Sequence, residues 1–380
     1  MDFSLDDEQV ALRDAVRSLV TKTYGDFEQR RRTSASEPGY DESLWRQLAE
    51  MGVLGLPFAE DDGGMGAGPV EVGLVAAELG RVLAPEPFLA SVVLAGGAVA
   101  AAGTADQRAE LLGALAAGER LLALAHEETV PVTASPFGDG WRLNGTKEPV
   151  LHGAGADLLV VSAALADGGT GLFLVEGSDA DIDGYRTYDG GRAARVRLED
   201  APATVLGEPG ADQATTLAGV LAAARLAACH EALGGMEAAL AATTGYLKSR
   251  KQFGVTLNTF QALTFRAADM YVSLELTRSI VDWATMVLAT GDATRAAEAS
   301  ARAALQVSRA GRHIGQEAIQ LHGGIGMTAE YLVGNITAHL TVLDHLLGDG
   351  QQQLVALMAG VGDYEALDPL APTMRSTSSQ

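Results

Sequence analysis

A stretch of 157 residues, 211–367, contains no proline, and this constrains the fold more than any other feature of the sequence. Residues 211–367 lack proline and are filled with long Ala- and Leu-rich runs such as 217–228. Proline breaks the interior of a helix, because it has no N–H to donate and its ring clashes with the preceding turn. A proline-free stretch of this length therefore predicts a bundle of long helices, interrupted mainly at Gly245 and at Gly323-Gly324.

The two preceding zones show different patterns. In residues 6–118 apolar side chains recur at helical spacing, as in Val10, Val16 and Val20. In residues 119–207 the pattern changes to short apolar runs bounded by Gly, Asp and Asn, at the spacing of a small β-barrel or sandwich. The predicted strands are 121–125, 141–143, 158–162, 171–175 and 194–198, and Gly138-Asp139-Gly140-Trp141 predicts a hairpin turn.

Helices, strands and helices thus follow one another in separate blocks. Segregated blocks indicate an α+β fold, whereas a Rossmann fold would alternate strand and helix. We expect an N-terminal helical domain over 1–118, a middle β domain over 119–207 and a C-terminal long four-helix bundle over 208–365. The remaining residues, 366–380, are expected to form a disordered tail.

Composition excludes several classes of partner and site. The chain has 27 Lys and Arg against 49 Asp and Glu, a net charge of −22, so polyanionic nucleic acids and membrane surfaces are not expected as partners. The single cysteine, Cys229, excludes an internal disulfide framework and a thiolate zinc site, and no metal is expected. Residues 1–8 have no signal-peptide pattern, and no uninterrupted apolar stretch reaches the roughly 20 residues of a membrane span. We therefore expect a cytoplasmic protein.

Two segments of the helical third carry recognisable chemistry. The first, 246–254, is followed by Phe260-Gln261, and its Arg250 could neutralise a pyrophosphate while amides and an apolar ring serve an adenosine. The second, 320–331, contains Gly323-Gly324, whose missing side chains let a phosphate or ribose approach the backbone. Either segment alone is equally explained by a helix end and a surface ion pair. Both together, in this order, favour a nucleotide cofactor.

These two segments, in this order and separation, resemble those of the acyl-CoA dehydrogenase superfamily, and the block order agrees over nearly the whole chain. More narrowly, 122–128, 150–153 and 343–354 resemble the small subunit of pimeloyl-CoA dehydrogenase and subunits of actinobacterial steroid-side-chain dehydrogenases that work as unlike pairs. The resemblance implies that FAD binds across a subunit interface. One subunit would supply Arg250, Gln252, Phe253 and Gln261, and the other would supply Gln320, Gly323 and Gly324.

The resemblance also implies a reaction, for which this chain lacks the usual base. In the family a carboxylate removes the α-proton of an acyl-CoA while hydride leaves for the flavin, and electron-transfer flavoprotein accepts the electrons. The register puts Leu347 at the usual glutamate position and Ala224 at the alternative one, and neither can take a proton. Asp349 is the nearest carboxylate and a weak candidate, with a helix-capping or loop role as the alternative. Glu231 is a weaker candidate still.

The strands that face the flavin in the family also depart from its pattern. Pro149 and Leu151 stand where a Trp-x-Thr sequence is usual, so ring stacking and a hydrogen bond to the flavin are both lost. Glu127-Glu128 replaces the start of a Thr-Glu-Pro sequence and is expected to repel a reduced, anionic flavin. The neighbouring histidines, each open to a flavin-side role or to an ordinary role at a strand end, are His126 and His152.

These departures favour the non-catalytic partner in an α₂β₂ heterotetramer, whose unlike subunit supplies the base. Three alternatives stay open: a self-sufficient homo-oligomeric dehydrogenase that uses Asp349, a flavin-free scaffold homologue, and a flavin monooxygenase on the same fold. A dicarboxylyl-CoA and a bulky steroid or polyketide acyl-CoA are both compatible with the subfamily resemblance, and the acyl group is not readable from the sequence.

Overall fold

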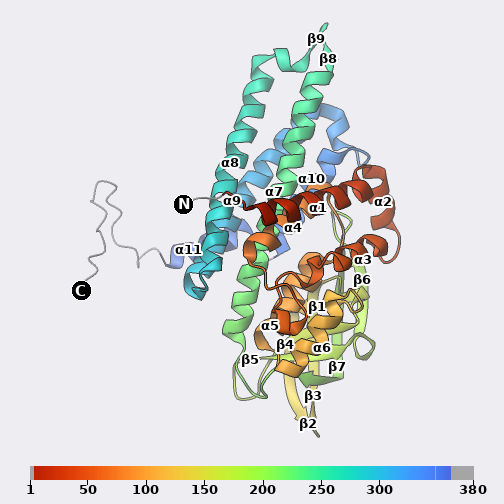
Figure 1. Ribbon diagram of the computed structural model, residues 1–380, viewed down its shortest axis with the longest axis vertical. Coiled ribbons are helices and arrows are strands. Elements are labelled where there is room, and N and C mark those ends of the chain that lie inside the picture. Colours follow the sequence, from red (N-terminus) through yellow and green to blue (C-terminus); the bar gives the residue numbers. More distant parts are fainter. Residues whose placement is uncertain (1–3, 347, 361–380) are drawn as a thin grey trace, which may run out of the picture.

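The computed structural model describes residues 4–346 and 348–360. Leu347 and the tail expected at 366–380 lie outside these residues. Long helices extend toward one end of the molecule, at the top of Figure 1, and the strands gather at the other. The chain is helical, then stranded, then helical, so the predicted α+β class is confirmed.

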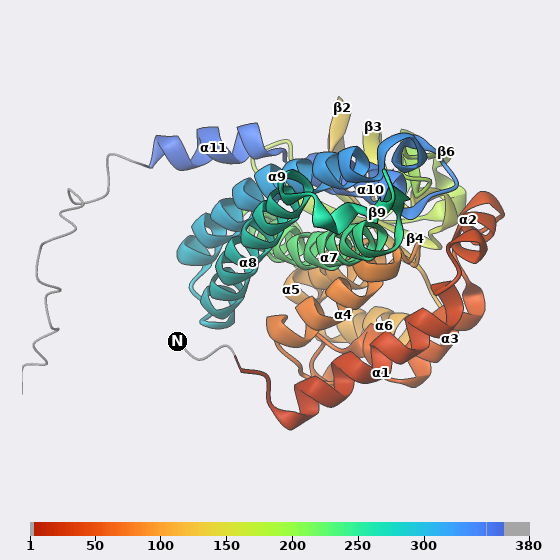
Figure 2. The same ribbon diagram turned by 90° about the horizontal axis from the view of Figure 1, so that it is seen from above.

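Short helices make up the first part of the chain. Asp6 caps α1, because its carboxylate accepts the N–H of Gln9 and the Gln9 side chain accepts the N–H of Asp6 in return. Helix α4 packs between α1 and the long helix α7 (Figure 2). The bounds are α1 Asp7–Tyr24, α2 Phe27–Ala35, α3 Glu42–Glu50, α4 Pro69–Val82, a π-helix η3 Phe88–Gly96, α5 Gly97–Ala102 and α6 Ala105–Ala116.

The strands form a sheet that closes on itself. Its order is β1-β4-β2-β3-β7-β5, and β5 pairs again with β4, so five strands form a ring while β1 and β6 pair outside it. Phe137 pairs with Gly140 across the two-residue turn of the β2–β3 hairpin, as the sequence predicts. The bounds are β1 Leu122–Ala125, β2 Glu128–Phe137, β3 Gly140–Leu151, β4 Leu158–Ala164, β5 Thr170–Glu176, β6 Asp181–Arg186 and β7 Arg192–Val205.

Strands β2 and β6 were not predicted, and both are polar. Most residues of β2 are exposed, and it contains Pro131 and Pro136, which argue against a central strand. Strand β6 is an edge strand that pairs with β7 and buries almost nothing. Strand β6 lacks the alternating apolar pattern of a half-buried strand, and in β2 the short alternation of Val130, Val132 and Ala134 is interrupted by proline.

The C-terminal part contains the expected long helices. Gly245, predicted to interrupt them, lies inside α7, where nothing crowds its Cβ position and the helix continues. Gly323, with φ of +67°, ends α9 as expected. The bounds are α7 Ala214–Ser249, β8 Lys251–Gln252, β9 Val255–Thr256, α8 Gln261–Ala289, α9 Ala293–His322, α10 Leu332–Leu346 and α11 Gly350–Ala359.

Helix α7 is central to the packing. It is long and apolar enough to cross a membrane by length and composition, but 61% of its most apolar window is buried inside the protein. One apolar core joins the N-terminal helices, β1, β4 and the first half of α7, a second lies within the C-terminal bundle, and a third fills the strand region. The first core contains residues from all three predicted domains. The predicted domain boundaries therefore stay a prediction.

Candidate functional site

The first predicted cofactor segment forms the tip of the helical bundle. Arg250 follows the last residue of α7, and the chain then turns through the β8–β9 hairpin at the top of Figure 1. Phe253 is 91% exposed and has a φ of +52°, a left-handed conformation that an ordinary side chain rarely adopts. All four predicted residues of this segment are exposed in the single chain: Arg250, Gln252, Phe253 and Gln261.

The second segment offers an open backbone and an unpaired acceptor. Gln320, Gly323 and Gly324 are exposed, and no atom lies within 4 Å of a Cβ built on either glycine. His322 is buried, and its Nδ1 lies 2.7 Å from the Ala318 carbonyl. A carbonyl only accepts, so Nδ1 carries the proton, and burial lowers the pKa of the ring. Its Nε2 is then a buried acceptor with no hydrogen-bond partner in the described chain.

The two segments lie at the same end of the bundle. The Tyr246 ring in the last turn of α7 stacks on His322 at the end of α9, with ring centroids 4.5 Å apart. Close by, Arg266 of α8 pairs with Glu317 of α9 at 2.5 Å. Sequence reasoning did not identify His322, although it lies within the quoted motif, because its role depends on a donor that only the fold supplies.

The strand side of the expected flavin position offers little space. A cavity of about 80 Å³ lies between the strands, α7 and α10, and Leu151, His152 and Leu346 are among its lining residues. Leu346 directly precedes Leu347, which itself lies outside the described residues. A cavity that holds benzene has about 150 Å³, and a flavin ring is larger than benzene, so this space is too small for it. Burial lowers the pKa of His152 to about 4, so its imidazole is neutral.

A buried ionic triad forms one wall of this cavity. His339 of α10 bonds through Nδ1 to Asp189 at 2.7 Å and through Nε2 to Glu231 of α7 at 2.9 Å. Burial alone would lower the pKa of His339, but these two hydrogen bonds outweigh it and raise the pKa to about 9. Burial would raise the pKa of Asp189, but the bond to His339 holds it well below its ordinary value. Glu231, the weakest candidate base, is therefore bound to an imidazolium.

A second carboxyl group borders the same cavity. Glu86 is only 7% exposed and accepts hydrogen bonds from the Tyr24 hydroxyl at 2.6 Å and the Asp41 N–H at 3.2 Å. Its Oε2 has no hydrogen-bond partner in the described chain, and burial raises its pKa to about 7. Nothing in the local sequence marks Glu86, because its partners lie 62 and 45 residues away.

The structure describes two of the candidate base positions, Ala224 and Asp349. Ala224 is fully buried within an apolar core. Asp349 caps α11, since its Oδ1 accepts the Gln352 N–H at 2.8 Å and the Gln352 side chain bonds back to the Asp349 N–H. The cavity lined by Arg225 and Gly348 has a volume of only about 20 Å³. Asp349 thus has the capping role that was its alternative interpretation.

The expected repulsion by Glu127-Glu128 needs correction. The Lys147 ammonium is fully buried and lies 2.5 Å from the Glu128 carboxylate, with further hydrogen bonds to Ser162 and to the His126 carbonyl. His126 Nε2 lies 3.5 Å from Glu127. This basic partner was missed because Lys147 is on a different strand. One of the two negative charges is therefore neutralised within the chain.

Comparison with known proteins decides the family. The family model for the acyl-CoA dehydrogenase N-terminal domain matches residues 6–119, and that for the C-terminal domain matches residues 214–361. The chain belongs to the acyl-CoA dehydrogenase family. The class expected from the two motifs, an FAD-dependent acyl-CoA dehydrogenase, is thereby confirmed at the level of the family.

Individual relatives cover almost the whole chain. Acyl-CoA dehydrogenase FadE27 of Mycobacterium tuberculosis is 30% identical over 365 residues, which cover 93% of this chain and 97% of that protein. Acyl-CoA dehydrogenase IpdE2 of the same organism is 34% identical over 329 residues, covering 86% of this chain and 88% of that protein. A chain of the ChsE4–ChsE5 complex from M. tuberculosis is 28% identical with a TM-score of 0.89, covering 96% of this chain and 100% of that chain.

Proposed function

We propose that this chain is the non-catalytic subunit of an FAD-dependent acyl-CoA dehydrogenase and works as half of an α₂β₂ heterotetramer. The observation that carries the proposal is a contrast within one molecule. The segments expected to hold adenosine are exposed and open, whereas the cavity expected to hold the flavin ring has about 80 Å³. Among the described residues, the candidate base positions hold an alanine, a helix cap and a carboxylate bound to His339.

The residues of the adenosine side fit the cofactor. Arg250 would offset the pyrophosphate charge, Gln252 and Gln261 would offer amides, and Phe253 would offer an apolar face. The open backbone at Gly323-Gly324 would receive the sugar and phosphate of the same or a second FAD. FAD, when bound, supplies the hydride acceptor of the reaction. The residues around Pro149 and Leu151 do not fit a flavin ring, and no chemical step is assigned to them.

An unlike subunit is the expected partner. Large apolar side chains are exposed along α8 and on both cofactor segments, and clustered exposed apolar surface marks an interaction site. They are Phe253, Phe260, Phe265, Val272, Leu276, Ile325 and Met327, with exposures between 36% and 91%. The related ChsE4–ChsE5 structure is itself a complex of two differently named chains. The partner's base would act on an acyl-CoA whose acyl group is a dicarboxylyl, steroid or polyketide unit, in the cytoplasm, with electron-transfer flavoprotein as acceptor.

Reconstitution tests the proposal. The chain and a candidate partner, purified separately, are expected to show no acyl-CoA dehydrogenation until they are mixed, because each lacks part of the site. Turnover by this chain alone would contradict the proposal and favour a self-sufficient enzyme. The second candidate is a flavin-free scaffold, which the small volume of the cavity expected to hold the flavin ring favours. A complex that never shows flavin absorbance would support it over the dehydrogenase subunit.

A further inference from the structure

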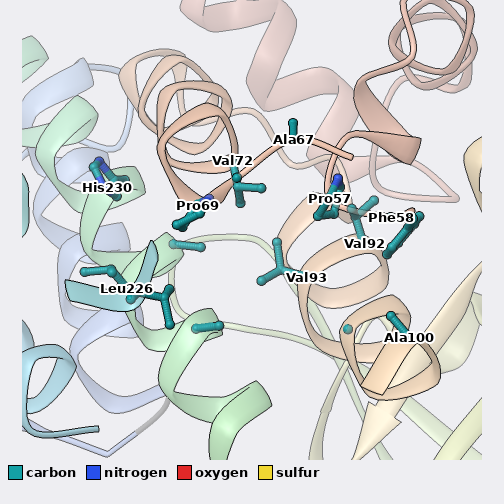
Figure 3. A pocket seen from close by; sticks show the side chains of 15 residues that line it. Pro57, Phe58, Ala67, Pro69, Val72, Val92, Val93, Ala100, Leu226 and His230 are labelled. Atoms are coloured by element: carbon teal, nitrogen blue, oxygen red, sulfur yellow. The ribbon is translucent and has the colours of Figure 1, made fainter. Parts of the chain in front are cut away.

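A second cavity lies against a different face of α7. It has a volume of about 270 Å³ and lies between α4, η3, α5, α7 and the loop before α4 (Figure 3). On α7 it is lined by Ala223, Leu226, Ala227 and His230, which follow the i, i+3, i+4, i+7 spacing of one helical face. The cavity of about 80 Å³ described above meets α7 at Glu231, which lies on another face. The two spaces are therefore separate sites.

The larger cavity is apolar and its lining carries no charged side chain. Figure 3 shows His230 and Leu226 at one end and Phe58 and Ala100 toward the other, with Val93 between them. An ion placed among these apolar side chains would lose hydration without a charged partner in the lining, which disfavours charged ligands. A cavity of about 150 Å³ holds a benzene ring, so about 270 Å³ has room for about ten carbon atoms.

His230 gives the cavity one polar end. Its Nε2 lies 2.7 Å from the Thr285 hydroxyl, which donates its own hydrogen to the Val281 carbonyl at 2.9 Å. Nε2 must therefore carry the proton and donate to Thr285, and Nδ1 is left as an acceptor. Burial lowers the pKa of His230 to about 4, so this neutral tautomer persists at physiological pH. In the part of the chain that the structure describes, the bond to Thr285 is the one hydrogen bond of the His230 ring.

Gly73 and a neighbouring cavity flank the His230 ring. A Cβ at position 73 would lie 2.6 Å from the His230 ring, so Gly73 of α4 provides the space for it. On its other side, His230 borders a polar cavity of about 450 Å³ that Arg17 and Arg278 also line. A hydroxyl group at His230 would therefore lie at the boundary between an apolar and a hydrated space.

We propose that this cavity binds an uncharged aliphatic or alicyclic alcohol of about ten carbon atoms, with its hydroxyl donating to His230. The small side chains at 67, 100, 223 and 227, all alanine, keep the volume open, and larger residues there would fill it. The site goes beyond the proposed dehydrogenase role, because it shares no residue with the cofactor segments.

Binding of three ten-carbon probes tests this site. Decan-1-ol, decane and decanoate are titrated into the purified chain, and affinity is measured by calorimetry and by the shift in unfolding temperature. Decan-1-ol is expected to bind about fivefold more tightly than decane, which is the worth of one net hydrogen bond. Decanoate is expected not to bind. His230→Phe should remove the preference for the alcohol while decane still binds.

Cavity-filling variants identify the location. Ala227→Leu should abolish binding, whereas Ala241→Leu, an exposed position on the same helix, should bind as the unmodified chain does. Should Ala227→Leu fail to fold, Ala100→Phe fills the other end from α5, where Ala100 is only partly buried. Unchanged decan-1-ol binding in a folded cavity-filling variant would overturn the proposal, and so would the absence of binding by both decan-1-ol and decane.

Discussion

His339 should make the stability of this protein depend on pH in the alkaline range. Its imidazolium joins α10 to Asp189 and to Glu231 of α7, and its side chain is only 10% exposed. The pKa rises from 6.5 to about 9, a difference of 2.5. At about 1.36 kcal/mol per pKa unit, this corresponds to at most about 3 kcal/mol. Because the folded state holds the proton more tightly, this stability is fully present below pH 6.5 and is lost as pH rises through about 9.

The assay is denaturant unfolding at about pH 6 and about pH 9.5, on the unmodified chain and on His339→Gln. The unmodified chain should lose up to about 3 kcal/mol more than the variant over this range. Glu86, whose pKa is about 7, also titrates there but is present in both proteins and cancels in the difference. His345→Gln, at a position 65% exposed, is the matched control and should behave as the unmodified chain does. Equal pH dependence in His339→Gln and the unmodified chain would refute this reasoning.

Three further substitutions test the site. Arg250→Ala should lower the flavin content of the assembled complex without changing the unfolding temperature, because Arg250 is exposed. Lys248→Ala, which is also exposed, is the control. Unchanged flavin content in Arg250→Ala would count against the assignment. Ala224→Glu should lower the free energy of unfolding by about 3 kcal/mol, because a carboxylate would replace a fully buried methyl group. The isolated variant should show no turnover. Turnover in that variant would show that only the base is missing. Asp349→Ala should cost about 1 kcal/mol through the lost cap and leave the turnover of the complex unchanged, as kinetics of the complex would reveal.

Much of the fold could be predicted because it depends on local pattern. The absence of proline over 211–367 predicts the long helices, and Gly138-Asp139 predicts the turn between β2 and β3. The two cofactor segments could be identified because their residues are close together in sequence. Their roles at the site stay predictions, since they depend on a partner and a cofactor.

The rest depends on contacts between distant residues. His339 bonds to side chains 150 and 108 residues away, and no local pattern distinguishes it from a surface histidine. Lys147 lies among polar residues in the sequence, yet its side chain is fully buried. Its ammonium group bonds to Glu128 and Ser162, which lie on other strands. The volumes of the cavities depend on how several helices pack. The small volume of the cavity at the expected flavin position could therefore not be predicted from Pro149 and Leu151 alone.

The ratio of flavin to protein in a complex purified after co-expression with an unlike dehydrogenase subunit tests the central claim most directly. If this chain contributes only the adenosine side of a shared site, the complex should contain one FAD for every two chains, and the chain purified alone should retain none. One tightly bound FAD per chain in the chain purified alone, with dehydrogenation by that sample, would contradict the account.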